Sequence, residues 1–245
     1  MSSQADGSAA GRSGRTGRRV LVGVLVALLL LLAADRLAAA AAQRSLAREL
    51  QSSEGLAARP EVHIRGFPFL TQVLAGRYGR VDLRARDVVR DGVQVSDVDV
   101  RLEGVEVGPS DAFSGRVREV PVRSGTGSVL LSYADLNGLV RQYGGALGSA
   151  VTVGPAGPGR LRADGPLGLS LTASVEVVDG RLLVTPDPAS LAALPPAAST
   201  LVTSTLQAPL AVPDLPFGAR LTGGTIDDSG ARLTATADGA VLRTR

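Results

Sequence analysis

The sequence predicts an α+β fold in which a curved, mainly antiparallel β-sheet wraps around long apolar helices. Strict alternation of apolar and polar residues, which is typical of half-buried strands, recurs between residues 60 and 245. Apolar residues at helical spacing separate these segments, and one such stretch carries no charge after Asp187. The alternation changes phase inside residues 93–105, which indicates a bulge or bend and therefore a curved sheet.

The composition limits the classes of function. Hydrophobic residues make up 44% of the 245 residues and aromatic residues only 3%, so the core must be built from Leu, Val and Ala. There is no Cys, which excludes disulfides, thiol catalysis and cysteine metal sites. Residues 1–59 hold eight Arg against four acidic residues, whereas residues 60–245 hold 18 Arg against 19 acidic residues. The nearly neutral body argues against binding of nucleic acid.

The N-terminal region precedes the body as an arm of two segments. Residues 1–19 are rich in Ser, Gly and Arg, and we expect a disordered, basic cytoplasmic tail. Residues 20–42 are expected to be a membrane anchor or signal segment, because an apolar run of 15 residues, Val20 to Ala34, follows the Arg cluster. The body is then held on the extracytoplasmic side of the cell membrane by a single span, or is exported after cleavage.

Cleavage of this arm is an open alternative. The run is short for a span, and Ala38 to Ala42 offers small residues for signal cleavage. We favour an uncleaved anchor, because the helical pattern continues without a breaker as far as Ser53. Residues 43–59 are then expected to form a helix and a linker, followed by one folded domain over residues 60–245. A buried helix of a soluble protein is a third interpretation of the apolar run.

The body opens with two alternating segments. Residues 62–65 and 78–88 are expected to be strands, with one helical turn at 71–74 between them. A turn at 90–92 leads to the strand at 93–105.

The middle of the chain is expected to hold one helix and one clear hairpin. Residues 106–127 are turn-rich, and residues 128–143 show helical spacing that ends at Gly144 and Gly145. After a turn at 154–159, alternation is clearest in 167–178, which a tight Asp179-Gly180 turn joins to 181–185.

The last part of the body returns to the sheet. Residues 188–207 are expected to be apolar helix, broken at Pro195-Pro196, and either buried or lining a site. Residues 209–216 are expected to be extended. Residues 217–225 and 231–237 are expected to be the closing strands on either side of a turn at 227–230.

The sequence offers few residues that could form a catalytic or metal-binding site. The single histidine, His63, lies on the polar side of a predicted strand, and no Gly-x-Ser-x-Gly motif is present. Asp97 and Asp99 share a strand face but lack further ligands nearby, and Asp227 to Gly230 reads as a β-turn rather than a calcium loop. We therefore expect no enzyme, no metal and no cofactor.

Two features remain as candidates for binding. The link from Gly66 to Leu70, Gly-Phe-Pro-Phe-Leu, holds two of the four phenylalanines, and is either a core plug or the mouth of an apolar site. An Arg cluster on the next strand is either a contact for a charged headgroup or a solvated strand face with Asp82 and Asp87 interleaved. Its members are Arg77, Arg80, Arg84, Arg86 and Arg90.

Residues 64–88, IRGFPFLTQVLAGRYGRVDLRARDV, resemble the opening motif of the LmeA-like phospholipid-binding family of actinobacteria. Residues 215–239, LPFGARLTGGTIDDSGARLTATADG, resemble the closing hairpin of that family more weakly. The resemblance extends over roughly residues 45–243. The matching positions are Gly66, Phe67, Pro68, Phe69, Leu70 and Gly76 in the first motif and Leu215, Pro216, Phe217 and Gly218 in the second.

The resemblance implies a cell-envelope protein that binds phospholipid in an apolar cavity, with a fold similar to tubular lipid-binding proteins. It also implies support for envelope lipid or lipoglycan biogenesis, and it carries over no catalytic residue. The residues expected at the cavity mouth are Gly66, Phe67, Pro68, Phe69, Leu70, Leu74 and Phe217, and those expected at the headgroup are Arg77, Arg80 and Arg84. The alternative is an envelope scaffold that binds a protein partner and no lipid.

Overall fold

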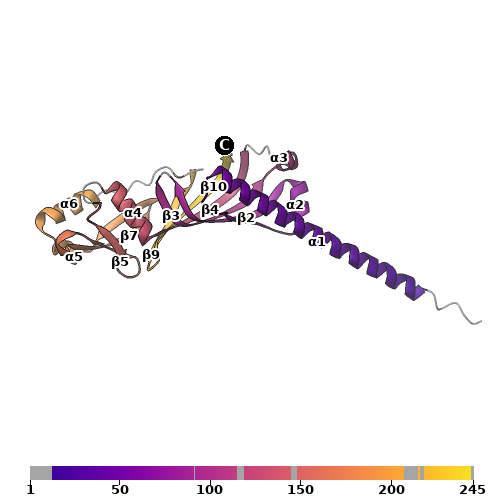
Figure 1. Cartoon of the computed structure of the whole chain (residues 1–245), viewed down its shortest axis with the longest axis horizontal. Coiled ribbons are helices and arrows are strands. Elements are labelled where there is room, and N and C mark those ends of the chain that lie inside the picture. Colours follow the sequence, from indigo (N-terminus) through magenta and orange to yellow (C-terminus); the bar gives the residue numbers. More distant parts are fainter. Residues whose placement is uncertain are drawn as a thin grey trace, which may run out of the picture.

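The computed structural model describes residues 13–90, 92–114, 119–144, 148–206, 215 and 218–243. These residues form two antiparallel sheets that lie end to end, with a long N-terminal helix that extends away from them (Figure 1). The predicted α+β class and the antiparallel pairing are confirmed, with two sheets in place of one. That a sheet wraps around long helices stays a prediction.

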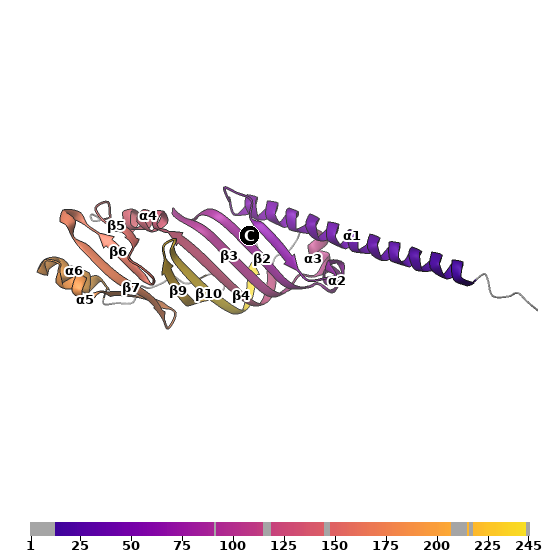
Figure 2. The ribbon, with the colours of Figure 1, turned by 90° about the horizontal axis from the view of Figure 1, so that it is seen from below.

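The larger sheet has six strands in the order β1-β2-β3-β4-β10-β9. Its strands are β1 Glu61–Arg65, β2 Arg77–Arg90, β3 Val93–Glu106, β4 Glu119–Ser132, β9 Arg220–Asp227 and β10 Gly230–Arg243. The smaller sheet has the order β5-β6-β7-β8, with β5 Thr152–Pro155, β6 Arg160–Asp164, β7 Ser170–Val178 and β8 Arg181–Pro186. Figure 2 shows the two sheets side by side along the long axis of the molecule.

The helices lie at the ends and edges of these sheets. They are α1 Ser13–Ser53, α2 Phe69–Ala75, α3 Pro109–Ser114, α4 Tyr133–Tyr143, α5 Pro188–Ala192 and α6 Pro196–Leu206, with a 3-10 turn at Pro166–Gly168. The helix α1 packs on β1 and α2, and α4 packs on β3, β4, β10 and β5. The break between α5 and α6 falls at the predicted pair of prolines.

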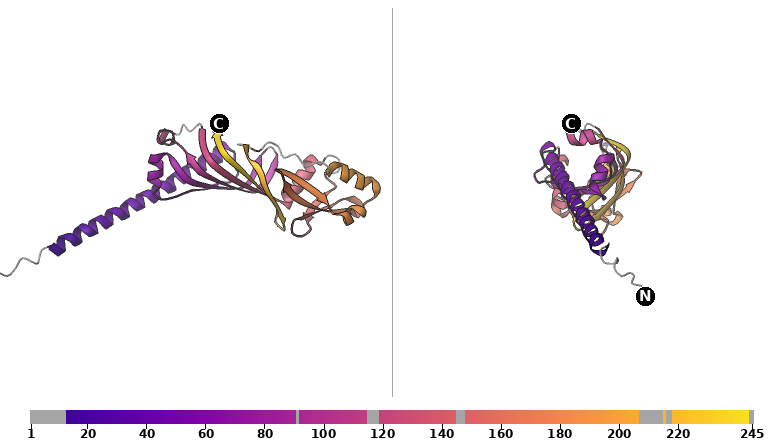
Figure 3. Two further views of the ribbon diagram at one scale, coloured as in Figure 1. Left: turned by 180° about the vertical axis from the view of Figure 1, so that it is seen from behind. Right: turned by 90° about the vertical axis from the view of Figure 1, so that its right-hand side faces the viewer.

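The long helix α1 begins earlier than the sequence predicts. It starts at Ser13, inside the segment 1–19 that we expected to be disordered, while residues 1–12 lie outside the described part of the chain. Arg is a good helix former, so the apolar helix can extend into the basic segment at little cost. Its N-terminal part projects away from the body (Figure 3, left).

The boundary between β4 and α4 corrects two predictions. Residues 119–132 form a 14-residue strand, although we expected turns up to residue 127 and a helix from residue 128. The strand pairs with β3 on one side and with β10 on the other, and these two ladders override the helical spacing of its apolar residues. The helix starts after Ser132, whose side chain caps it.

The phase change predicted in residues 93–105 is present, but it takes no extra residue. The β2–β3 register is the same before and after Ser96, so there is no bulge of one strand against the other. Asp87, directly opposite Ser96, has a φ of 51°, and this pair interrupts the ladder without shifting it. A true register shift occurs instead between β10 and β9, at Thr234/Ala235.

A second line of irregular residues crosses four strands of the six-stranded sheet. Gly79, Gly104, Arg123 and Gly239 lie opposite one another, and each interrupts the ladder without changing its register. Gly104 and Gly239 have φ of 61° and 64°. Beyond this line the buried side chains Val105, Val122 and Ala240 occupy the other phase of their strands. We call these four positions the crease.

The two sheets are joined through β9 and α4. The Gly159 N–H donates to the Ile226 carbonyl at 2.9 Å, and a Val177 methyl lies 3.0 Å from where a Cβ on Gly224 would be. On the other side, the Asn137 side chain of α4 bonds both the N–H and the carbonyl of Val153 in β5. These contacts join β6 and β7 of the small sheet to β9 of the large one, and β5 to α4.

The remaining predictions for the body follow the structure closely. The strands at 62–65, 78–88 and 167–178, the hairpin at 179–180 and the closing strands appear within a few residues of their expected limits. The predicted helical turn at 71–74 is part of α2. The expected extended segment 209–216 lies outside the described residues except for Leu215.

Candidate functional site

One face of the six-stranded sheet is apolar from edge to edge. Residues directly opposite each other in an antiparallel ladder share a face, so the registers assign these side chains to one side. They include Val62 and Ile64 in β1; Val81, Leu83 and Ala85 in β2; Val98, Val100 and Leu102 in β3; Val129 and Leu131 in β4; Ala231, Leu233, Ala235 and Ala237 in β10; and Leu221 and Ile226 in β9. We call this surface the apolar face.

The apolar face is only half covered. Val62, Ala85, Leu221 and Ile226 are buried, but the central members from β2, β3, β4 and β10 are of intermediate exposure. No large side chain among the described residues is fully buried. A sheet face that belonged to a closed core would be packed at high density and largely inaccessible. This face therefore has the character of a lining surface.

The middle of the apolar face is lined by small residues. Gly125 and Gly127 of β4 lie between Leu102 and Val100 on β3 and Ala237 and Ala235 on β10. A Cβ built on Gly127 would meet nothing within 4 Å. A Cβ built on Gly125 would lie 3.3 Å from a Leu102 methyl, so the β4 backbone at Gly127 is the place left open for close approach by another molecule.

Helices close the two ends of the apolar face. At one end, α2 buries Phe69 against Tyr78, with ring centroids 6.4 Å apart, and burial raises the pKa of the Tyr78 phenol. At the other end, the Asp135 carboxylate of α4 accepts hydrogen bonds from the hydroxyls of Ser96 and Ser132. Figure 3 (right) shows the molecule along its length, with strands curved around one side and α1 crossing the other.

The predicted mouth residues separate into two groups. Phe69 is buried, and Gly66 has a φ of 111° with the Gln72 side chain 2.7 Å from the position of a Cβ, so these two shape a corner. Phe67, Leu70 and Leu74 are exposed, as is Pro68. The predicted segment is therefore both a core plug and an apolar surface. Phe217 lies outside the described residues.

A carboxylate from α1 reaches this segment. The Asp35 side chain is only 3% exposed, and its Oδ1 accepts a hydrogen bond from the Leu70 N–H at 2.8 Å. The N-cap residue of α2 is Pro68, which has no capping side chain, so Asp35 provides the acceptor from a distant part of the chain. One residue further along α1, the Arg36 guanidinium lies over the Phe67 ring, 4.6 Å from its centroid.

The predicted headgroup arginines lie on the polar face of the sheet and have carboxylate partners. Arg84 contacts Asp99 at 2.6 Å, Arg80 contacts Glu103 at 3.3 Å and Arg77 contacts Glu106 at 3.6 Å. The same face carries Asp82, which forms ion pairs with Arg65 and Arg101. Burial by itself would raise the pKa of Asp82, but the hydrogen bonds from these two arginines outweigh burial, so the pKa is lowered. Any phosphate at this face would compete with these carboxylates.

The other polar residues singled out in the sequence show no catalytic arrangement. His63 is exposed on β1, and the Asp227 carboxylate accepts bonds from the N–H and hydroxyl of Ser229 within a β-turn. Within the described part of the chain, no group of three or more residues could hold a metal ion. The glycines of β4 are the feature of the apolar face that sequence reasoning missed; the small residues of the segment GTGSV at 125–129 were the signal.

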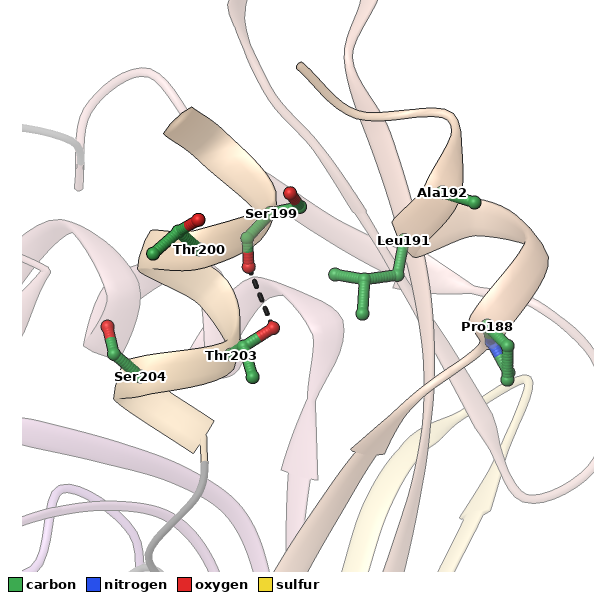
Figure 4. Close-up of a pocket in the computed structure, with 7 residues that line it drawn as sticks. All are labelled: Pro188, Leu191, Ala192, Ser199, Thr200, Thr203 and Ser204. Atoms are coloured by element: carbon green, nitrogen blue, oxygen red, sulfur yellow. Dashed lines mark hydrogen bonds between the residues drawn. The ribbon is translucent and has the colours of Figure 1, made fainter. Parts of the chain in front are cut away.

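A separate hollow lies between α5 and α6 at the far end of the molecule (Figure 4). Its volume is about 520 Å³ and it is wide open to solvent. Its lining residues are Pro188, Leu191, Ala192, Ser199, Thr200, Thr203 and Ser204. The hydroxyls of Ser199, Thr200 and Thr203 donate to carbonyls of their own helix, at 2.8 to 3.0 Å. None of the predicted site residues lies in this hollow.

Comparison with known families identifies one match. The family model described as LmeA-like phospholipid-binding matches residues 33–236, which is more than half of the chain. No curated protein matches the chain, and no solved structure does. The matched segment begins two residues before Asp35, contains α2 and the strands β1 to β9, and ends within β10.

Proposed function

The chain belongs to the LmeA-like phospholipid-binding family, and we propose that it holds the acyl chains of a phospholipid along the apolar face. The family description names a binding activity and no catalytic one. The observation that carries the proposal is a continuous apolar sheet face whose central side chains remain half-exposed and whose middle is lined by Gly125 and Gly127. Acyl chains gain free energy from such a surface by leaving water.

The bound lipid would complete the architecture expected from the sequence. The predicted wrapping of a curved sheet around apolar elements would then involve the acyl chains as well as helices. For the headgroup we propose Arg77 among the three predicted arginines, because its side chain is 78% exposed and its ion pair with Glu106 is the longest of the three. Arg77 also follows directly after α2, at the proposed mouth.

The membrane attachment follows from α1. Its residues Leu21 to Ser53 include a segment apolar and long enough to cross a membrane or to serve as a signal. We propose an uncleaved anchor, because Asp35 and Ala39 are buried against the body and cleavage within Ala38 to Ala42 would remove at least Asp35. The Arg cluster before the span places the N-terminus in the cytoplasm and the body outside.

The proposed setting is the cell envelope. A protein that withdraws a phospholipid from the outer face of its own membrane would serve envelope lipid or lipoglycan biogenesis. Neither nucleic acid nor a cofactor has a part in this proposal.

The test is photocrosslinking in membranes that contain the full chain. A phospholipid with a diazirine on one acyl chain is added, the sample is irradiated, and crosslinked peptides are mapped by mass spectrometry. We expect crosslinks on β3, β4 and β10, at residues of the apolar face. The variant Gly127→Phe should lose most of the crosslinking, because its ring would occupy the open middle of that face.

The matched control is Gly154→Phe. Gly154 is also a strand glycine whose Cβ would meet nothing within 4 Å, but it lies opposite Arg162 on the polar face of the small sheet. Crosslinking should be unchanged in this variant. Undiminished labelling of Gly127→Phe would contradict the site, and no labelling of the wild-type chain would favour the scaffold alternative.

A further inference from the structure

An exposed apolar edge lies beside α1 at the end of the large sheet. Three side chains form it: Phe67, 59% exposed; and Leu70 and Leu74 of α2, 39% and 74% exposed. Leu70 and Leu74 are one helical turn apart, so both point to the same side of α2. Figure 2 shows α2 next to α1 at this end of the sheet. We call these three residues the α2 edge.

Two contacts hold the α2 edge at one level of α1. The hydrogen bond from the Leu70 N–H to Asp35 and the stacking of Arg36 on Phe67 join α2 to consecutive residues of α1. Before Asp35, the described side chains of α1 from Leu21 to Ala34 are all exposed, and burial against the body starts at Asp35. The α2 edge therefore sits where the apolar run ends.

The length of the apolar run determines how deep the α2 edge would lie in a bilayer. The 15 residues from Val20 to Ala34 span about 22 Å as a helix, at ~1.5 Å per residue. The hydrocarbon core of a bilayer is about 30 Å thick. The run alone therefore leaves roughly 8 Å of the hydrocarbon core unspanned. This thickness is within the depth of about 5–10 Å to which the apolar faces of interfacial helices are buried.

We propose that the α2 edge inserts into the outer leaflet of the membrane that α1 spans, so that the end of the apolar face meets that leaflet directly. The occupant of this surface is the lipid bilayer itself. The inference rests on the proposed function, and it adds a route: lipid would pass between leaflet and apolar face without crossing water. A protein partner at the same surface is the competing outcome of the test.

The polar groups at this depth are partly paired. The Asp35 Oδ1 accepts a hydrogen bond from the Leu70 N–H, and its Oδ2 has no hydrogen-bond partner among the described residues but is enclosed by the fold. The Arg36 guanidinium lies on the Phe67 ring with an aliphatic stem long enough to reach the headgroups. Unpaired polar groups in the hydrocarbon region would oppose insertion. Arg77 follows α2 and is exposed, in position to contact phosphates at the surface.

The test uses the absence of Cys from the chain. The full-length variant Leu74→Cys is labelled with the fluorophore NBD and reconstituted in vesicles of phosphatidylglycerol and phosphatidylcholine. We expect a blue-shifted emission that is quenched by lipids with a spin label near the headgroup. The control is Leu167→Cys, which replaces a leucine that is 97% exposed on the far sheet and should emit as in water. Identical, water-like emission at both positions would overturn the proposal.

A second measurement separates this proposal from the proposed function. Leu74→Asp should slow the uptake of the diazirine phospholipid by about tenfold, the size expected for losing one buried leucine, and leave the final extent unchanged. Leu167→Asp should alter neither. If Leu74 is buried in lipid but the wild-type chain is never crosslinked, the proposed function fails and the insertion stands. If crosslinking occurs and Leu74→Asp has no effect on its rate, insertion fails alone. Shielding of the Leu74 label without quenching by lipid would identify a protein partner instead.

Discussion

At the scale of single residues, Asp135 joins three elements through one carboxylate. Its Oδ2 accepts hydrogen bonds from the Ser132 N–H at 2.9 Å, the Ser132 hydroxyl at 2.7 Å and the Ser96 hydroxyl. The Ser132 side chain in turn accepts from the Asp135 N–H, which completes a capping box at the start of α4. The strand β4, the helix α4 and the strand β3 at Ser96 are therefore fixed at one point.

Replacing Asp135 by Asn should lower the free energy of unfolding at neutral pH by about 1–2 kcal/mol, because caps and buried hydrogen bonds to charged groups contribute at this level. Burial opposes ionisation, but the hydrogen bonds from Ser96 and Ser132 outweigh it and lower the pKa of Asp135. The folded pKa thus lies below the unfolded value of about 3.9. The contribution is present above that value and is lost as the pH falls through the folded pKa.

Urea unfolding of the two proteins between pH 7 and pH 2 checks this prediction. The difference between wild type and Asp135→Asn should shrink only in the acidic part of the range. Asp238→Asn, at an exposed position of β10, is the control and should follow the wild type throughout. A difference that stays constant down to the lowest pH would show that the charge of Asp135 is not involved.

The sequence contains the signal for one of these residue contacts and not for another. Ser132-Tyr-Ala-Asp135 has the spacing of a capping box, and this motif would have placed the start of α4 correctly. The bond between Asp35 and Leu70 could not be predicted, since its partners are 35 residues apart and only the folded chain brings them together. Likewise, the sequence grouped Phe67 and Phe69 in one apolar link, but it could not tell that only Phe69 is buried.

At the scale of elements, the crease explains how the apolar residues can switch between odd and even positions in neighbouring strands and still lie next to one another. Gly79, Gly104, Arg123 and Gly239 interrupt four strands along one line, so the registers on both sides remain the same. Two of them have positive φ, a region in which residues with a side chain are strained. The curvature of the sheet at this end thus depends on glycine at particular positions.

Gly104→Val is expected to be among the most damaging single changes in the sheet. Its φ of 61° and the Arg123 Cβ, 2.8 Å from where a Cβ would be, both oppose a side chain. Backbone strain of this kind costs about 1–3 kcal/mol, and the melting temperature of a chain of this size should fall by about 2–4 °C per kcal/mol. Thermal unfolding followed by circular dichroism measures the change.

Gly79→Ala is the control, because Gly79 lies directly across the ladder from Gly104 and a Cβ there would meet nothing within 4 Å. Its melting temperature should stay close to that of the wild type. Equal losses in both variants would indicate that the crease depends on glycine in general and not on the left-handed backbone of Gly104.

The local sequence pattern was sufficient to predict most helices and strands. The elements that were not predicted depend on pairing between strands that are distant in the sequence. The alternation in β1, β2 and β7, the turn at Asp179-Gly180 and the break before α6 were sufficient to locate them. The strand β4 was not recognised, because its segment from 123 to 128 is rich in small and polar residues. That segment is held as a strand by its two neighbours, and no local preference encodes this.

At the scale of the whole molecule, the C-terminal part of α1 and the body form a single unit. From Asp35 onward α1 presents a helical stripe to the body, with Asp35, Ala39 and Ala47 buried. The turn after Ser53 brings the chain back, and β1 lies against α1. The family match, which starts at residue 33, includes this stripe.

Truncated chains test whether the helix after the span belongs to the body. The chain 35–245 should melt at a higher temperature than 43–245, because the latter lacks the acceptor for the Leu70 N–H, the Arg36 contact with Phe67 and the buried Ala39. A start at residue 33 should give the same stability as a start at 35. In membranes, the intact mass should correspond to the uncleaved chain. Equal stability of all three truncations would favour a cleaved signal segment.

The overall organisation was predictable in outline only. Charge and hydropathy separated the body from a long apolar N-terminal helix, and the motif at 64–88 identified the family that the chain belongs to. The division into two sheets was not predicted, since it depends on which strands pair, and β5 and β6 have only four and five residues. The apolar face is a property of all six strands together, and it becomes visible only once their registers are known.

The unbroken course of α1 has a mechanical consequence. A domain attached through a flexible linker can turn freely, but here the same helix runs from its apolar segment into its packing against β1. With α1 as the proposed anchor, the body would be held at a fixed tilt, and the α5–α6 end would stand at a constant height above the bilayer. A molecule that receives lipid at that end would have to be present at this height, so the spacing of the envelope layers would select which acceptors the protein serves.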